Sequence, residues 1–134
     1  MDRDTTDDLT AISPSQNPDA PIPFCDGQGF KRLVRFGLAW LERHQAAINA
    51  LNVYPVPDGD TGTNVVLTMQ SAYQEIQNSP EGEVGIIAQK VAHGALMGAR
   101  GNSGVILSQI FRGFARTLDN VKSFDTVQFA ARLR

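Results

Sequence analysis

Apolar side chains recur at intervals of three and four residues along most of this chain, and no segment alternates apolar with polar residues. The longer period is that of an α-helix with one buried face, whereas a half-buried strand repeats every two residues. The first apolar stripe contains Phe30, Leu33, Val34, Gly37, Leu38, Leu41, Ile48 and Leu51. The pattern therefore predicts an all-α fold that begins with a helix over 28–50.

Four further segments repeat the helical period and are separated by turn residues. They predict helices over 63–77, 83–97, 103–119 and 126–134. Apolar residues cover more than one side of 103–119, so we expect that helix to be largely buried. Short connections favour an antiparallel up-and-down bundle. Because the chain ends within the fifth helix, we expect a truncated bundle that is completed either by later helices or by helices of a partner.

The first 26 residues differ in composition from the rest. They contain six aspartates, one arginine and four prolines, so their net charge is −5, and since the whole chain carries −2, the remainder carries +3. Such a segment predicts a disordered leader (1–26) ahead of one domain (27–134). The leader lacks the basic start and apolar centre of a signal peptide, and no apolar run reaches the roughly 18 residues of a membrane span. We therefore expect a cytoplasmic protein without a membrane span.

The rest of the composition narrows the possible partners and chemistries. The basic residues of 27–134 are scattered and form no dense stripe, which argues against nucleic acid as a partner. Cys25 is the only cysteine, so a disulfide within the chain and a thiolate metal cluster are both excluded.

The most informative polar segment is LNVYPVPDGDTGTN, residues 51–64, which interrupts two helical patterns. Asp58 and Asp60 flank Gly59, where a bend would let both carboxylates face one point. Hard oxygen ligands of this kind suit Mg²⁺, which often joins carboxylates to nucleotide phosphates. The spacing fits neither a Walker A loop nor an EF-hand, whose twelfth position would be Met69. A simple turn that caps the next helix remains the alternative.

A second glycine-rich segment, GARGNSG (98–104), also leads into a predicted helix. In an up-and-down bundle the helices over 63–77 and 103–119 run in the same direction, so the two segments should meet at one end. Free amides and the positive end of the macrodipole at helix N-termini favour phosphate. Arg100 either pairs with such a phosphate or stays solvated, and the sequence leaves both open.

The two motifs LNVYPVPDGDTGTN and GALMGARGNSGVILSQIFRGF resemble those of the dihydroxyacetone kinase L-subunit superfamily, and more closely those of its fatty acid kinase A branch. The resemblance covers 26–134. It implies a helical barrel of about eight helices, of which this chain would supply about five, that binds ATP or ADP through two Mg²⁺ ions.

The resemblance also implies roles for particular residues. Asp58, Asp60 and Asn52 match positions at the metals. The nucleotide-facing positions are matched by Thr61, Gly62, Thr63 and Asn64 in the first segment and by Gly101, Asn102, Ser103 and Gly104 in the second.

In the fatty acid kinase branch, the domain phosphorylates a fatty acid carboxylate presented by a DegV-like lipid-binding protein, and in the other branch a second subunit presents a ketose. We therefore expect Mg-ATP-dependent phosphoryl transfer to a partner-bound acceptor, with an acyl phosphate as the favoured product. The alternatives are a glycerone kinase-type subunit and a non-catalytic nucleotide-binding or interaction module. Whether the chain forms a homodimer is left open.

Overall fold

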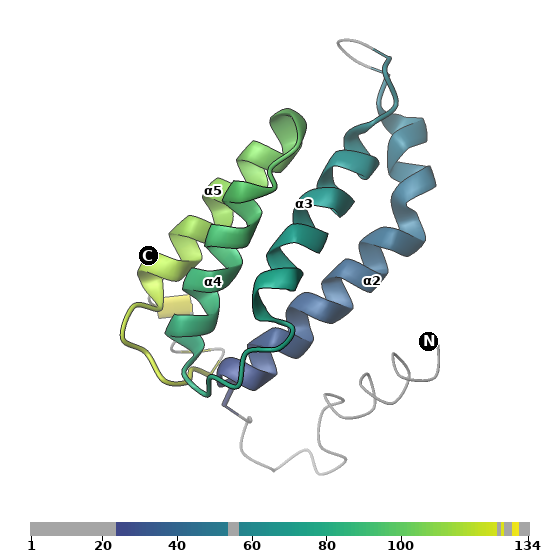
Figure 1. Ribbon diagram of the computed structural model, residues 1–134. Coiled ribbons are helices and arrows are strands. Elements are labelled where there is room, and N and C mark those ends of the chain that lie inside the picture. Colours follow the sequence, from purple (N-terminus) through teal and green to yellow (C-terminus); the bar gives the residue numbers. More distant parts are fainter. Residues whose placement is uncertain (1–23, 54–56, 126, 128–129, 132–134) are drawn as a thin grey trace.

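Figure 1 shows a computed structural model, which describes residues 24–53, 57–125, 127, 130 and 131. The described residues form four named helices: α2 (Gly27–Leu51), α3 (Thr61–Ile76), α4 (Val84–Met97) and α5 (Gly101–Thr117). Their only β-pairing is an isolated bridge between Cys25 and Phe124. The predicted all-α class is confirmed, and the first four predicted helices agree with the observed bounds to within two residues.

Two predictions fall wholly or mainly outside the described residues. Of the fifth predicted helix, 126–134, only Val127, Ala130 and Ala131 are described, and these three are helical. Of the predicted leader, 1–26, only the last three residues are described. The division into a leader and a domain over 27–134 therefore stays a prediction.

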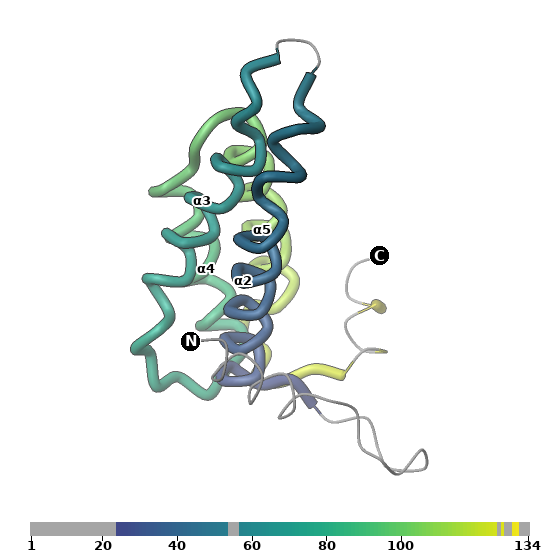
Figure 2. Tube along the Cα trace, turned by 90° about the vertical axis from the view of Figure 1, so that its right-hand side faces the viewer, coloured from purple at the N-terminus to yellow at the C-terminus, as the bar shows by residue number. Residues whose placement is uncertain are grey.

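Consecutive helices run in opposite directions (Figures 1 and 2). The α2–α3 and α4–α5 connections lie at one end of the bundle, and the α3–α4 connection lies at the other. α3 packs against both α2 and α4, and α5 packs mainly against α4 and less extensively against α3. This is the predicted up-and-down order, and it gives α3 and α5 the same direction.

The core forms where the apolar stripes of the helices meet. Its main cluster combines Val34 and Leu38 of α2, Val66, Met69, Ala72 and Ile76 of α3, and Ile87, Val91 and Ala95 of α4, with Leu107 and Phe111 of α5 packed against it. The contributing positions on each helix are three, four or seven residues apart, as one helix face requires. Burial of this face fixes the directions of α3 and α5.

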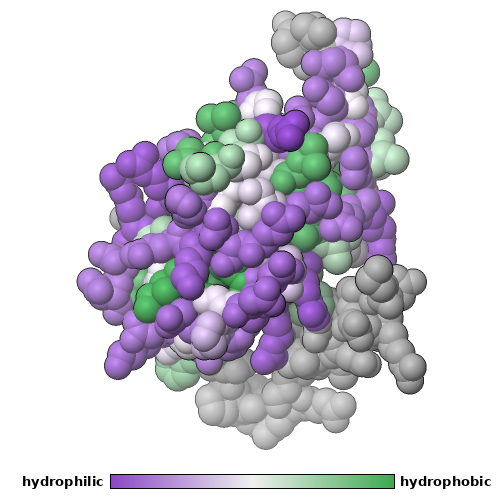
Figure 3. Space-filling view, viewed as in Figure 1, coloured by the Kyte–Doolittle hydropathy of each residue, from purple (hydrophilic) through white to green (hydrophobic). Residues whose placement is uncertain are grey.

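The prediction that α5 is largely buried is wrong. Only Gly104, Ser108 and Ala115 are buried along it, whereas Val105, Ile106 and Ile110 are 50%, 61% and 49% exposed. α5 is partly exposed because it packs only on the side that faces α4 and α3, and the rest of its surface faces outward. Apolar patches are visible on the otherwise mainly hydrophilic face in Figure 3. None of the described helices is both long and apolar enough to cross a membrane.

Candidate functional site

The start of α5 lies beside the first two turns of α3, to which a buried threonine joins it. The backbone amide of Arg100 donates to Thr68 Oγ1 at 3.1 Å, and the same hydroxyl donates to the carbonyl oxygen of Asn64 at 2.8 Å. Thr68 is completely buried within α3. The predicted meeting of the two glycine-rich segments is confirmed, and the residue that fixes it was not among the predicted site residues.

Two glycines allow this close approach. Gly101 has φ +64°, and a Cβ there would lie 2.5 Å from Asn64 Nδ2. A Cβ at Gly104 would collide with the hydroxyl of Thr68. A side chain at either position would push α5 away from α3, so the absence of Cβ atoms is part of how the site is built.

Asn52 organises the first segment from the end of α2. Its Oδ1 accepts the amide of Asp60 at 3.1 Å and that of Thr61 at 3.2 Å. These two contacts use both lone pairs of the amide oxygen and satisfy amides at the start of α3. Asn52 therefore positions the loop that contains Asp58 and Asp60, which we call the carboxylate loop. Its expected role as a metal ligand stays a prediction, and a metal contact through Oδ1 would replace one of these hydrogen bonds.

Thr63 is held by two polar side chains of α2. Its amide donates to Asn49 Oδ1, while its hydroxyl oxygen accepts from Asn49 Nδ2 and from Gln45 Nε2, all at 3.0 Å. The hydroxyl proton is left for another acceptor, such as a phosphate oxygen. Gly62 makes room for these contacts, because a Cβ there would lie 2.8 Å from Asn49 Oδ1.

Gln45 and Asn49 were also missed by the sequence analysis. Gln45 lies where the apolar stripe pauses between Leu41 and Ile48, and Asn49 follows four residues later on α2. Paired amides on one face near a helix end were the available signal. Their target, Thr63, could not be read from the sequence because it lies across a loop.

The two aspartates remain available to a cation. Both are exposed, and neither carboxylate bonds to another part of the chain that the structure describes. Asp60 occupies the N-cap of α3, yet its side chain makes no capping hydrogen bond. Gly59 between them has φ +61°, which gives the bend that the sequence predicted.

Two exposed carboxylates have the chemistry of a Mg²⁺ site, and a turn that caps the next helix remains the alternative. Magnesium in proteins is commonly held by one or two carboxylates, with water and substrate phosphates completing the octahedron. No group of three or more His, Cys, Asp or Glu side chains suited to a metal lies among the described residues. The pair would therefore hold a solvated or phosphate-bridged ion, and not a cation enclosed by protein ligands.

The two helix N-termini are not equivalent. At α3 the amides of Thr61 and Thr63 are already bonded to asparagine side chains. At α5 the first-turn amides of Gly101, Asn102 and Ser103 bond to no described residue, and the N-cap residue Arg100 provides no side-chain cap. The start of α5 is therefore the better anion site of the two.

The family model for the DAK2 domain matches residues 55–134, which is more than half of the chain. The chain belongs to the DAK2 domain family. This family is of the dihydroxyacetone kinase type, and its domains bind nucleotides of the ADP or ATP kind. The family resemblance expected from the two motifs is confirmed.

Several bacterial proteins share the DAK2 sequence closely. The protein YloV of Bacillus subtilis is 45% identical over 109 residues, which cover 81% of this chain and 20% of YloV. An uncharacterized protein of Staphylococcus saprophyticus is 47% identical over 105 residues, covering 78% of this chain and 19% of that protein. A relative from Staphylococcus aureus is 46% identical over 95 residues, covering 71% and 17%. The chain spans about a fifth of the length of the relatives it matches.

Within the DAK2 domain, the residues expected at the site fall into two sets. One set offers groups without a bonding partner among the described residues: the carboxylates of Asp58 and Asp60 and the amides of Gly101, Asn102 and Ser103. The other set builds the frame, namely Asn52, Thr61, Gly62, Thr63, Asn64 and Gly104. The carboxylates of the first set lie on the α2–α3 connection and its amides lie in the first turn of α5, and the second set holds these two segments together.

Proposed function

We propose that this DAK2 domain binds Mg-ATP between the carboxylate loop and the start of α5 and transfers the γ-phosphoryl group to an acceptor held by a partner protein. The observation that carries the proposal is the pairing of two carboxylates, Asp58 and Asp60, with the first-turn amides of α5, all of them without a bonding partner among the described residues. Negative phosphates and a cation between them would complement both halves of this arrangement.

Each part of the chain has a defined task in this proposal. Asp58 and Asp60 hold Mg²⁺, which neutralises phosphate charge when it is bound. The amides of Gly101, Asn102 and Ser103 bind phosphate oxygens along the axis of α5, and the Thr63 hydroxyl can donate to another. Asn52 and Thr68 act through the backbone by keeping the two loops in register. Phosphoryl transfer depends mainly on such positioning and charge stabilisation.

The favoured acceptor is the carboxylate of a fatty acid, presented by a DegV-like lipid-binding protein. A carboxylate is already ionised near neutral pH, so it needs no general base, whereas a ketose hydroxyl must lose a proton. The polar groups that the structure assembles around Thr68 and Thr63 are amides and hydroxyls, with no histidine among them. This favours acyl phosphate over glycerone phosphate as the product.

Calorimetry of nucleotide binding tests the site directly. In the Asp58→Asn, Asp60→Asn double variant, both side chains keep their shape and lose their charge. We expect Mg-ADP binding to be abolished while metal-free ADP binding changes little. The matched control is Glu42→Gln, Glu75→Gln, which removes two exposed charges from α2 and α3. Undiminished Mg-ADP binding by a folded aspartate variant would refute the site.

A second experiment separates the acceptors. Labelled ATP is supplied to a longer protein that contains this domain, with a fatty acid and its lipid-binding partner in one reaction and dihydroxyacetone and its subunit in the other. Label in acyl phosphate supports the favoured acceptor, and label in glycerone phosphate supports the other branch. Tight Mg-ADP binding without label transfer to either acceptor would instead identify a non-catalytic nucleotide-binding module.

A further inference from the structure

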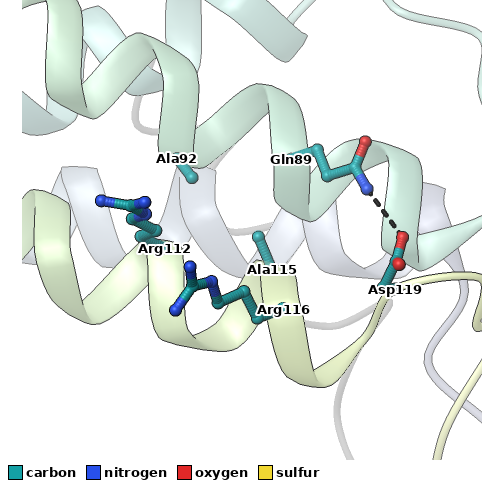
Figure 4. A pocket seen from close by; sticks show the side chains of 6 residues that line it. All are labelled: Gln89, Ala92, Arg112, Ala115, Arg116 and Asp119. Carbon is teal, nitrogen blue, oxygen red and sulfur yellow. Dashed lines mark hydrogen bonds between the residues drawn. The ribbon is translucent and has the colours of Figure 1, made fainter.

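A hollow of about 330 Å³ lies between α4 and α5 (Figure 4). Its lining residues are Gln89, Ala92, Arg112, Ala115, Arg116 and Asp119. The two alanines explain why the space is open, since neither helix places a long apolar side chain there. The volume is at the lower end of the range of small-molecule sites.

Arg112 and Arg116 make this hollow cationic. They stand one turn apart on α5, so their side chains lie on the same face of the helix. In Figure 4 the Arg116 side chain extends towards Arg112 and away from Asp119. Neither arginine has an ion-pair partner within the part of the chain that the structure describes.

The one acid in the lining is oriented by another residue. Asp119 Oδ1 accepts a hydrogen bond from Gln89 Nε2 at 3.0 Å, at the far end of the hollow. The two guanidinium groups stay charged at all physiological pH values. They are exposed and stand one turn apart on α5, and neither is paired with a carboxylate of the described residues. Like charges at this spacing repel, and a bound anion would remove that repulsion.

The hollow is separate from the nucleotide site. Arg112 and Arg116 follow Gly101 by 11 and 15 residues on the same helix. At the helical rise these separations are about 16 and 22 Å along the axis. A nucleotide phosphate held by the first turn of α5 would therefore lie well away from either guanidinium.

A second, smaller hollow of about 170 Å³ continues the groove towards the start of α5. It shares Ala92 and Arg112 with the first, and it adds His93, Leu96, Ser108 and Gln109. Leu96 is 55% exposed and gives this part an apolar wall. The groove thus offers two cations at one end and an apolar surface beside them.

We propose that this α4–α5 groove is a second ligand site, which takes a phosphate monoester. The phosphate group binds between Arg112 and Arg116, where a dianion matches two guanidinium groups that can each donate two hydrogen bonds. A short apolar arm of the ligand extends along Ala92 towards Leu96. Binding here is independent of the magnesium and nucleotide loops.

The test uses the NMR signals of the arginine Nε–Hε groups in the intact chain, assigned with Arg112→Lys and Arg116→Lys. Inorganic phosphate, phenyl phosphate and acetate are titrated at matched ionic strength. We expect saturable shifts of the Arg112 and Arg116 signals, with phenyl phosphate binding more tightly than inorganic phosphate and acetate more weakly than both. Replacement of either arginine by glutamine should weaken binding roughly tenfold or more.

A control variant locates the binding. Arg32→Gln, at an exposed position of α2, should leave the titration unchanged. The proposal is overturned if all arginine signals move together with salt, or if the remaining Arg112 signal saturates with unchanged affinity in a folded Arg116→Gln variant. Equal affinity for acetate and phosphate would refute recognition of a dianion, and equal affinity for both phosphates would refute the apolar arm.

Discussion

The hydroxyl of Thr68 accepts a hydrogen bond from the backbone amide of Arg100 at 3.1 Å, and so joins the interior of α3 to the residue that precedes α5. The same hydroxyl donates to Asn64 within α3. Because Thr68 is completely buried, water cannot readily replace either contact. Together with the close approaches at Gly101 and Gly104, this side chain therefore holds the start of α5 against α3.

Thr68→Val should loosen this connection without changing the volume of the core. The Arg100 amide loses its acceptor, so we expect the free energy of unfolding to fall by about 1–3 kcal/mol. Mg-ADP affinity should fall as well, because the α5 amides are no longer held against the carboxylate loop. Urea denaturation and calorimetry measure the two effects. Thr68→Ser retains the hydroxyl and should keep most of the affinity, and equal losses in both variants would contradict a role for the hydrogen bond.

Substitutions of Asn52 distinguish a role in positioning the loop from a role as a metal ligand. Asn52→Ala removes the acceptor for the amides of Asp60 and Thr61, and we expect a loss of about 0.5–2 kcal/mol in stability, as for other helix caps. Asn52→Asp keeps the accepting oxygen and adds a negative charge at the start of α3, so stability should be retained. Thermal unfolding with and without Mg²⁺ distinguishes the roles. A metal effect that disappears in Asn52→Ala at unchanged stability would identify Asn52 as a direct ligand.

The close approach at Gly101 leads to a third prediction. Gly101→Ala places a Cβ at a positive φ and 2.5 Å from Asn64 Nδ2, so we expect about 1–2 kcal/mol of destabilisation and weaker nucleotide binding. The matched control lies on the same helix. Gly113 has no neighbouring atom within 4 Å of an added Cβ, and Gly113→Ala should raise stability by about 0.5–1 kcal/mol. If both alanines were tolerated equally, the contact with Asn64 would not constrain the loop.

The helices could be predicted from the sequence because their apolar stripes are long and their connections contain glycine, proline and asparagine. The juxtaposition of the two loops also followed, since antiparallel order alone gives α3 and α5 one direction. The exposure of α5 could not be predicted from the sequence. Ile106 and Ile110 have apolar side chains and were therefore expected to be buried, and only the arrangement of the neighbouring helices shows that they lie on an outward face.

The residues that support the site were the hardest to predict. Thr68 lies in mid-helix, where a threonine has no distinctive pattern, and its partner Arg100 is 32 residues away. Asn49 and Thr63 form a hydrogen bond across the α2–α3 connection, although they are 14 residues apart. Such contacts depend on tertiary packing, whereas acids and glycines on loops have a chemistry that can be recognised locally.

Cys25 lies next to the start of α2, where backbone hydrogen bonds with Phe124 fix its position. Its amide donates to the Phe124 carbonyl at 2.7 Å, and the Phe124 amide returns a bond of 3.0 Å. Burial of the thiol and the nearby negative charge of Asp26 raise the pKa of Cys25 from 9.0 to about 11. Both causes disfavour the thiolate, so the folded protein holds this proton more firmly than the unfolded chain.

This raised pKa predicts a decrease in stability at alkaline pH. The folded-state pKa lies above the unfolded value, so the contribution to stability is fully present below pH 9 and is lost as the pH rises towards about 11. The difference in unfolding free energy between the protein and Cys25→Ser should be constant below pH 9 and should change above it, which urea titrations at several pH values can measure. Iodoacetamide should modify the native thiol at least several-fold more slowly than the urea-unfolded thiol at pH 9, because little thiolate is present. A pH-independent difference together with rapid native alkylation would show that the thiol is neither buried nor shifted.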